Sequence, residues 1–384
     1  MLNCAEFFEL LTSKGTEFYC GVPDSLLKSF CAYLKDSVPS NKNFITANEG
    51  TAIGLAAGVY LATNKPALVY MQNSGEGNAV NPLTSLADPK VYGIPMLLII
   101  GWRGQPGVKD EPQHVKQGEI TLELLKTLGI PYEVLPQEFV DAEAAINKAF
   151  ECMHSSKEPY ALVIRKDTFE LYEALKKDST PSPYSLTREE AIQIILKITS
   201  TINNPVFVST TGMASRELYE NRIKMGQKGD SDFLTVGSMG HASSIALGIA
   251  LHAPDRTVFC IDGDGAMLMH MGTLTTIAES GVTNFKHIVI NNGAHDSVGG
   301  QPTCGFKVDF GKIAKACGYQ KTWLATTEEE LIKAVEEFIS TKEFGLLEVR
   351  VKKGARKDLG RPKSSPAENK IKLMQYLMPF LNQR

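Results

Sequence analysis

The stretch that decides the fold is VFCIDGDGAMLMHMGTLTTIAESGVTNFKHIVINN, residues 258–292. An apolar run typical of a buried strand ends at the Gly-Asp-Gly turn 263–265, and a second such run ends in a pair of asparagines, the second of which is Asn292. Glycines let the backbone approach a ligand closely, and a helix N-terminus attracts phosphate. Because a carboxylate repels bare phosphate, Asp264 indicates an intervening cation, and Asn292 adds an oxygen ligand that suits Mg²⁺. The stretch predicts a cation and phosphate site at the edge of a parallel sheet.

The turn alone is a weak signal, because Asp-Gly is common in turns. A dinucleotide fingerprint, and with it an NAD-dependent dehydrogenase, is disfavoured because residue 268 is Leu where that motif needs a third glycine. The turn joined to the asparagine pair, with 27 residues between Asp264 and Asn292, is much more specific.

Outward from this stretch, helical patterns alternate with nearly all-apolar β runs, which is how strands of a parallel sheet buried on both faces read. A polar segment with two prolines, 176–187, is typical of a linker. We therefore expect two doubly wound α/β domains, 1–178 and 188–384. The expected helices are 3–14, from Pro23, 49–63, 75–87, 116–128 and 138–155, then 187–199, from Gly212, 240–251, 270–280, 309–317, 327–340 and a final one. The expected strands are 16–22, 43–47, 66–72, 95–101 and 160–166, then 205–210, 233–236, 256–262, 286–292, 320–325 and 345–351.

Composition narrows the class of protein. The chain has 384 residues, a formal net charge of −3, 43% hydrophobic and 22% charged residues, as an ordinary globular protein does. This balance gives no bulk attraction to nucleic acid or anionic lipid. Seven cysteines without a CxxC pair favour reduced thiols, the N-terminus lacks a basic leader, and no apolar run is long enough to span a bilayer. We expect a cytoplasmic protein.

The Gly-Asp-Gly turn, the spacer and the asparagine pair together resemble the signature of the thiamine diphosphate (ThDP) enzymes. The resemblance implies a pyrimidine-binding (PYR) domain over 1–178 and a diphosphate-binding (PP) domain over 188–384, without a middle domain. It implies ThDP and Mg²⁺ as cofactors. It also implies that Gly263, Asp264, Gly265, Ala266, Asn292 and Ala294 bind the cofactor, with Asp264, Asn292 and Ala294 as metal ligands.

Further segments of the chain also resemble this family. Glu49, in ITANEGTAIGLAAGVYLAT, matches the glutamate that activates the aminopyrimidine ring, although a lone Glu at a helix N-terminus is otherwise only a favourable dipole contact. In VGSMGHASS, Met239 matches the wedge that bends the cofactor and Gly237 the carbonyl that accepts from its amine. Weaker matches that imply cofactor contacts are Ser238, Thr211, Gly212, Asn73 and Ser74.

The short two-domain architecture is similar to ThDP-dependent 2-oxo acid decarboxylases, closest to the phosphonopyruvate decarboxylase type. This resemblance implies that the chain converts 3-phosphonopyruvate to phosphonoacetaldehyde and CO₂ through a ThDP ylide and an enamine, as in phosphonate biosynthesis. Sulfopyruvate decarboxylation and a non-catalytic ThDP-binding protein stay open as alternatives. It also implies a homodimer or larger oligomer with each cofactor between two chains.

An anionic substrate needs cations near the reacting carbon. Arg103, Lys109 and Lys116 lie after the strand 95–101, close to Gln113, His114 and Gln117. His114 is the candidate for proton transfer, because imidazole donates and accepts near neutral pH. Ser25 is a further catalytic candidate, and the predicted substrate contacts are Arg103, Lys109, His114 and His295. Pyruvate decarboxylases carry a glutamate soon after the asparagine pair, whereas this chain reads HDSVGG, so the acid that protonates the enamine stays open.

Overall fold

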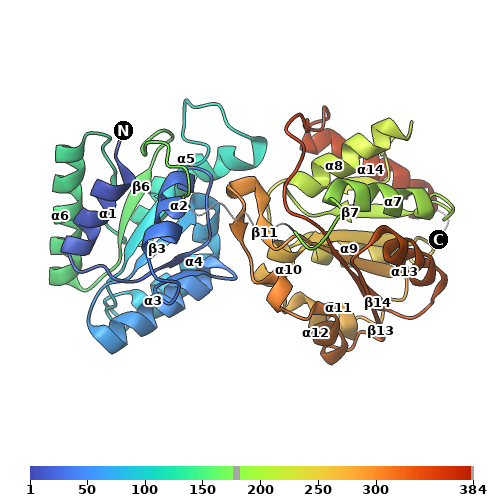
Figure 1. Ribbon diagram of the computed structural model, residues 1–384, viewed down its shortest axis with the longest axis horizontal. Helices are drawn as coiled ribbons and strands as arrows, with labels where there is room; N and C mark the ends of the chain where they lie inside the picture. Colours follow the sequence, from blue (N-terminus) through green and yellow to red (C-terminus); the bar gives the residue numbers. More distant parts are fainter. Residues whose placement is uncertain (176–181, 382–384) are drawn as a thin grey trace. The chain divides into compact units, whose positions relative to one another are not determined.

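The protein is described by a computed structural model over residues 1–175 and 182–381. It divides into two compact units, Met1–Ser179 and Thr180–Arg384. Each unit is an α/β layer structure with helices on both faces of one sheet (Figure 1). Half of the predicted linker, 176–181, lies outside the described residues.

The first unit is built on a six-stranded parallel sheet in the order β2-β1-β3-β4-β6-β5. Its strands are β1 (Tyr19–Gly21), β2 (Asn43–Ile45), β3 (Leu68–Gln72), β4 (Leu97–Gly101), β5 (Tyr132–Val134) and β6 (Tyr160–Ile164). Its helices are α1 (Cys4–Ser13), α2 (Lys28–Ser37), α3 (Glu49–Thr63), α4 (Glu76–Pro82), α5 (Pro112–Thr127) and α6 (Phe139–Ser156), with short turns η1 (Asn73–Gly75) and η2 (Leu83–Ala87) around α4.

Alternating side chains of the strands pack into two separate hydrophobic cores, one on each face of the sheet. Leu97 and Ile99 pack with α1, α2 and α6, whereas Leu98 and Ile100 pack with α3, α4 and α5. Both faces of β4 are therefore buried, which explains why its sequence is apolar without alternation.

The second unit repeats this plan with the order β13-β14-β10-β9-β7-β8, again parallel throughout. Its strands are β7 (Val206–Ser209), β8 (Asp232–Leu234), β9 (Val258–Gly263), β10 (Phe285–Asn291), β13 (Lys321–Ala325) and β14 (Gly345–Arg350). One face is covered by α7 (Arg188–Thr199), α8 (Met213–Lys224) and α13 (Glu328–Ser340). The other is covered by α9 (Ala242–His252), α10 (Asp264–Met269), α11 (Thr273–Glu279), α12 (Phe310–Ala316) and α14 (Pro366–Leu381). The prediction of two doubly wound parallel sheets is confirmed.

Several local expectations were wrong. The helix expected from Pro23 begins at Lys28, because Asp24 first closes a turn by accepting from the Leu26 N–H at 2.9 Å. The helix expected over 270–280 begins only at Thr273, as α11, and the separate short helix α10 precedes it. The edge strand β5 and the two-residue hairpin strands β11 (Ala294–His295) and β12 (Gln301–Pro302) were not predicted.

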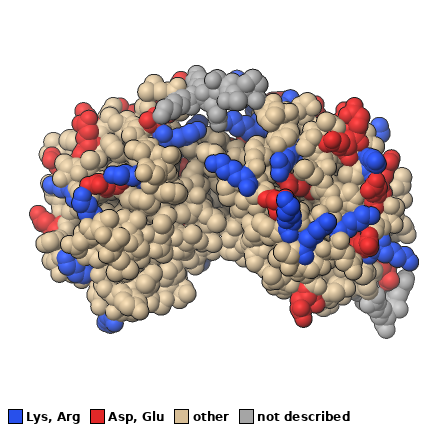
Figure 2. Space-filling view, turned by 60° about the horizontal axis from the view of Figure 1, so that its bottom comes forward, with Lys and Arg blue, Asp and Glu red and all other residues tan. Residues whose placement is uncertain are grey.

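Charged side chains of both signs are interspersed on the face shown in Figure 2, and each unit carries both. Among the described helices, none is long and apolar enough to cross a membrane.

Candidate active site

In both sheets the strand order reverses beside the first strand of the unit, so the strands leave a crevice at their carboxyl ends where ligands bind in folds of this kind. In the first unit the loops at this edge follow β1, β3 and β4, and in the second unit the loops at its own edge follow β7, β9 and β10. Most of the residues predicted from the sequence lie on these six loops or on the helices that follow them.

In the second unit, the Gly-Asp-Gly turn lies at the end of β9 and the start of α10. Asp264 is 2% exposed, and burial raises its pKa to about 6. The Thr303 hydroxyl donates to its Oδ2 atom, and the Asn292 N–H lies 3.4 Å from Oδ1. The prediction that Asp264 and Asn292 come together at one sheet edge agrees with this contact.

The oxygen atoms at this edge fit the ligand set of a hard divalent cation. Asn292 is 5% exposed, and its Oδ1 accepts from the Ala294 N–H at 3.1 Å, which leaves that amide oxygen a second lone pair. The carboxylate of Asp264 and the amide oxygen of Asn292 are of the type that Mg²⁺ prefers. Asn291, by contrast, is fully buried and donates to the Gly305 carbonyl and to Glu348, so its side chain is structural.

The loop 237–240 approaches the same turn. Gly237 and Ser238 have φ values of 74° and 44°, and the Gly237 N–H donates to the Thr211 hydroxyl at 3.0 Å. Gly212, with φ of 93°, is the N-cap residue of α8 and directly follows Thr211. The predicted contacts Thr211, Gly212, Gly237 and Ser238 are therefore gathered at one place.

Gly265 is the point where three predicted residues meet. A Cβ atom added there would lie 2.8 Å from the His295 ring and 3.2 Å from the Met239 methyl, so no larger residue fits. Burial lowers the pKa of His295 to about 4, which keeps its imidazole neutral at physiological pH. Gly263 and Ala266 flank the acid in the same turn, and Ala266 is buried.

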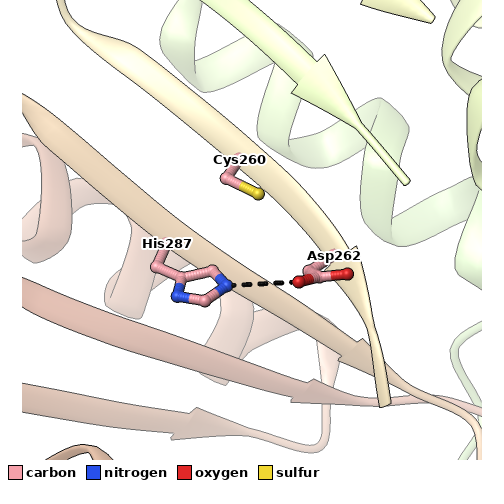
Figure 3. Close-up of side chains that lie close together, drawn as sticks. All are labelled: Cys260, Asp262 and His287. Atoms are coloured by element: carbon pink, nitrogen blue, oxygen red, sulfur yellow. Dashed lines mark ion pairs between the residues drawn. The ribbon is translucent and has the colours of Figure 1, made fainter. Parts of the chain in front are cut away.

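A second polar cluster lies on β9 and β10 below this edge, in the face that packs against α9 and α12 (Figure 3). Asp262 Oδ2 is 3.5 Å from His287 Nε2, and His287 Nδ1 is 3.2 Å from the Tyr319 hydroxyl. Among the described residues, one group of three His, Cys, Asp or Glu side chains lies close enough together to share a metal ion: Cys260, Asp262 and His287. However, burial raises the pKa of the Cys260 thiol well above its usual range, and a protonated thiol is a poor ligand. We assign the cluster a structural role.

In the first unit, Glu49 is the first residue of α3 and is 4% exposed. Its Oε2 accepts from the Asn78 amide at 2.7 Å. A Cβ atom on Gly75 would lie 2.3 Å from the other oxygen, so only glycine leaves room for this carboxyl group. A buried acid held by one amide fits the predicted role of Glu49 beside the aminopyrimidine ring of ThDP.

A cavity of about 310 Å³ lies at the carboxyl end of the first sheet. Ser25, Arg103, Lys109, Asp110 and Lys166 line it, so three cations face one carboxylate. Arg103 donates to Ser25 Oγ at 2.7 Å and through Nε to Asp110 at 2.8 Å, with a further contact through Nη2. Burial acts to raise the pKa of Asp110, but bonds from Arg103 and two backbone N–H groups outweigh it and hold the pKa well below its usual range. The cavity suits a small anion.

The remaining predicted residues of this unit divide by their contacts. His114 is 8% exposed, and both burial and the charge of Arg103 lower the pKa of its imidazole. Asn73 is fully buried, and its amide donates to the Arg103 carbonyl at 2.8 Å and to Thr121, so its side chain holds the cavity loop. Ser74 donates to Gln72 at 2.7 Å. Lys116, expected near the substrate, pairs instead with Glu119 on the exposed side of α5.

Sequence reasoning missed three residues near these edges. Lys166 follows β6, far along the chain from Arg103, and only the sheet order brings it to the cavity. Asp296 accepts from the side chain of Asn292 at 2.7 Å. Glu76, the first residue of α4, is 3% exposed and has no hydrogen-bond partner for either oxygen among the described residues.

Comparison with known proteins shows the family to which the chain belongs. Residues 5–125 match the family model of the thiamine pyrophosphate enzyme N-terminal TPP binding domain, and residues 212–349 match that of the C-terminal TPP binding domain. The phosphonopyruvate decarboxylase of Streptomyces viridochromogenes is 33% identical over 96% of this chain and 93% of its own length. The sulfopyruvate decarboxylase of Methanosarcina acetivorans is 28% identical over 90% of each chain. A solved benzoylformate decarboxylase from Polynucleobacter necessarius aligns with 92% of this chain and 99% of its own at 15% identity and a TM-score of 0.38.

The chain therefore belongs to the thiamine pyrophosphate enzymes. Within them it is a member of the ThDP-dependent decarboxylase family, and the two units are its N- and C-terminal cofactor-binding domains.

Proposed function

We propose that this protein decarboxylates 3-phosphonopyruvate to phosphonoacetaldehyde and CO₂, a reaction of phosphonate biosynthesis. The observation that carries the proposal is the cation-lined cavity at Ser25, Arg103, Lys109 and Lys166. A phosphonate on C3 is a compact anion with several oxygens, which a guanidinium and two ammonium groups bind well. Supporting it, two phosphonopyruvate decarboxylases are 33% and 32% identical over 96% of this chain.

ThDP, when bound, supplies the electron sink that accepts the electron pair released as CO₂ leaves the substrate. In this proposal the carboxylate of Asp264 and the oxygens of Asn292 and Ala294 would hold Mg²⁺, which would anchor the diphosphate. The Glu49 carboxyl group, fixed by Asn78 through one oxygen, would use its other oxygen to exchange a proton with the aminopyrimidine ring. His114 is kept neutral by its surroundings, and it therefore accepts a proton without first losing one.

A direct assay tests the reaction. The protein is incubated with ThDP, Mg²⁺ and 3-phosphonopyruvate, and the products are followed by ³¹P NMR and CO₂ release. We expect phosphonoacetaldehyde. Sulfopyruvate, assayed in parallel, represents the second candidate, which the relative from Methanosarcina acetivorans favours. A kcat/KM for sulfopyruvate equal to or above that for 3-phosphonopyruvate would reverse the choice, and turnover of neither acid would favour a non-catalytic ThDP-binding protein.

We further propose that the protein is at least a homodimer, cytoplasmic, in which each cofactor lies between the N-terminal unit of one chain and the C-terminal unit of another. All seven cysteines are free thiols, in keeping with a reducing compartment. Mixing tests the shared site. Inactive Glu49→Gln and inactive Asp264→Asn chains, unfolded and refolded together, should recover about a quarter of wild-type activity, because half of the dimers then hold one intact site. No recovery after verified subunit exchange would place the whole site within one chain.

A further inference from the structure

The amide of Asn292 has a fixed orientation, set by a residue outside the predicted ligand set. Asn292 Nδ2 donates to Asp296 Oδ2 at 2.7 Å, and Asn292 Oδ1 accepts from the Ala294 N–H at 3.1 Å. We propose that Asp296 is a positioning residue for the metal ligand Asn292, and that Arg188 and Glu217 hold it in place. This inference rests on the proposed function, since it concerns the cation that Asp264 and Asn292 would bind.

The two contacts of Asn292 admit one orientation of the amide. A carboxylate only accepts hydrogen bonds and a backbone N–H only donates, so the NH₂ group must face Asp296 and the oxygen must face Ala294. With the amide reversed, its oxygen would lie against the Asp296 carboxylate and its NH₂ group against the Ala294 N–H. Asp296 and the Ala294 N–H therefore fix the orientation of the amide and leave its oxygen, and not its NH₂ group, with a lone pair for a cation.

Besides Asn292, two groups hold Asp296. Arg188 Nη1 donates to Asp296 Oδ2 at 2.8 Å, and the Gly354 N–H lies 3.2 Å from both carboxylate oxygens. Arg188 also makes a two-pronged contact with Glu217, from Nε at 2.7 Å and from Nη2 at 3.1 Å. These contacts join α7, α8 and the loop after β14 to the loop that follows β10.

Burial makes this network more than a surface ion pair. The exposed fractions of the Arg188, Glu217 and Asp296 side chains are 9%, 1% and 9%. Burial acts against the charged guanidinium, but Glu217 and Asp296 outweigh it, so the pKa of Arg188 is raised and the group stays charged.

The same unit offers a matched control. Arg222 and Asp232 form a buried pair of the same kind, with bonds of 2.8 and 2.7 Å and side-chain exposures of 9% and 2%. Asp232 lies at the start of β8, and its contacts do not include Asn292 or Asp264. Removing either aspartate costs an ion pair and leaves a buried arginine, but only one of the two faces a metal ligand.

The experiment measures the Mg²⁺ concentration that gives half-maximal ThDP binding, by thermal shift with ThDP in excess, and Mn²⁺ binding by EPR as a second readout without turnover. We expect Asp296→Ala to raise both the half-maximal Mg²⁺ concentration and the dissociation constant of Mn²⁺ by about 10–100-fold. This is the usual effect of losing a group that orients a metal ligand. Asp232→Ala should lower the melting temperature at least as much, because Arg188 keeps Glu217 whereas Arg222 keeps only the neutral Gln227, and should leave both metal readouts within about twofold of wild type.

A double variant separates positioning from general damage. If Asp296 acts through Asn292, then adding Asp296→Ala to Asn292→Ala should change the metal affinity no further, because the oriented oxygen is already gone. Additive losses, or equal losses in Asp296→Ala and Asp232→Ala, would overturn the inference. Wild-type protein that binds ThDP without any divalent cation would instead overturn the proposed metal site itself.

Discussion

The two sheets have the same strand order but carry different chemistry at their carboxyl ends. Numbered within its own unit, and without the hairpin β11–β12, each sheet runs 2-1-3-4-6-5. In the first, the loops after strands 1, 3 and 4 supply Ser25, the Asn73 amide and Arg103. In the second, the equivalent loops supply Thr211, Asp264 and Asn292. One frame therefore presents side chains at three equivalent places, and the loops alone decide what is bound.

The difference lies in how each edge treats an anion. The first edge offers guanidinium and ammonium groups directly, within one cavity. The second offers a buried carboxylate and amide oxygens, which attract an anion only through a cation. In our proposal the substrate is held in the first way and the cofactor diphosphate in the second.

Two acids sharpen this comparison, because Glu76 and Asp264 each begin the α-helix that follows the third strand of their unit. Asp264 receives bonds from Thr303 and the Asn292 backbone, whereas Glu76 has no partner among the described residues. Burial accordingly raises the pKa of Asp264 to about 6 and that of Glu76 to about 8. The helix start after the third strand thus holds a hydrogen-bonded acid, Asp264, in the second unit. In the first unit it holds Glu76, an acid without a hydrogen-bond partner among the described residues.

The largest effects on activity and cofactor binding should come from substituting Glu49 and Asp264, the two acids to which our proposal gives separate roles. Glu49→Gln should lower kcat by about 10²–10⁴-fold, as loss of an acid–base group does, while ThDP and Mg²⁺ binding stay within a few-fold of wild type. Asp264→Asn should instead weaken cofactor binding, because a neutral amide replaces the charged ligand. Steady-state kinetics and calorimetric titration with ThDP and Mg²⁺ check both. If Glu49→Gln retained full turnover, the proposed role of Glu49 would be wrong.

Glu76 should contribute to the pH dependence of stability in the first unit. Its pKa of about 8 in the folded chain exceeds the ordinary 4.5, so the folded state binds the extra proton. The stability contribution is fully present below pH 4.5 and is lost as the pH rises through 8, a change on the order of 5 kcal/mol. Glu76→Gln should flatten the free energy of unfolding between these pH values, measured by urea denaturation.

An exposed acid of the same unit provides the control for this measurement. Glu123 pairs only with Lys126 at the surface, and Glu123→Gln should leave the pH slope unchanged. An unchanged slope in Glu76→Gln would mean that the carboxyl group has a hydrogen-bond donor in the assembled protein, for example from a second copy.

Arg103→Lys tests the direct binding of an anion at the first edge. Lysine keeps the charge but loses the fork that holds Asp110 and Ser25 together, so we expect KM for 3-phosphonopyruvate to rise by about 10–100-fold, or roughly 1.5–3 kcal/mol. The Mg²⁺ requirement, which belongs to the other edge, should not change. Lys126→Met, on the exposed side of α5, is the matched control. An unchanged KM in Arg103→Lys would show that the substrate does not bind in this cavity.

The sequence predicted the sheets and the second edge better than the first edge, for physical reasons. Strands buried on both faces are apolar throughout, and Asp264 and Asn292 end neighbouring strands, so spacing alone brought them together. Lys166 could not be predicted, because its place depends on β6 lying beside β4, which no local pattern shows. Asp296 reads as a loop residue, and only its contacts with Asn292 and Arg188 distinguish it. The half-buried edge strand β5 lacks the apolar run that revealed the others.

The smallest effects should come from paired glycine substitutions that compare one helix of each unit. Gly118 of α5 lies under the cavity loop, where an added Cβ atom would be 1.7 Å from the Gly104 carbonyl oxygen. Gly118→Ala should therefore destabilise the protein by about 1–3 kcal/mol and disturb Arg103, which precedes Gly104. Gly248 of α9 has nothing within 4 Å of an added Cβ atom, so Gly248→Ala should stabilise by up to about 1 kcal/mol through helix propensity. Thermal unfolding checks both signs. Destabilisation by Gly248→Ala would show that this surface of α9 is covered in the assembled protein.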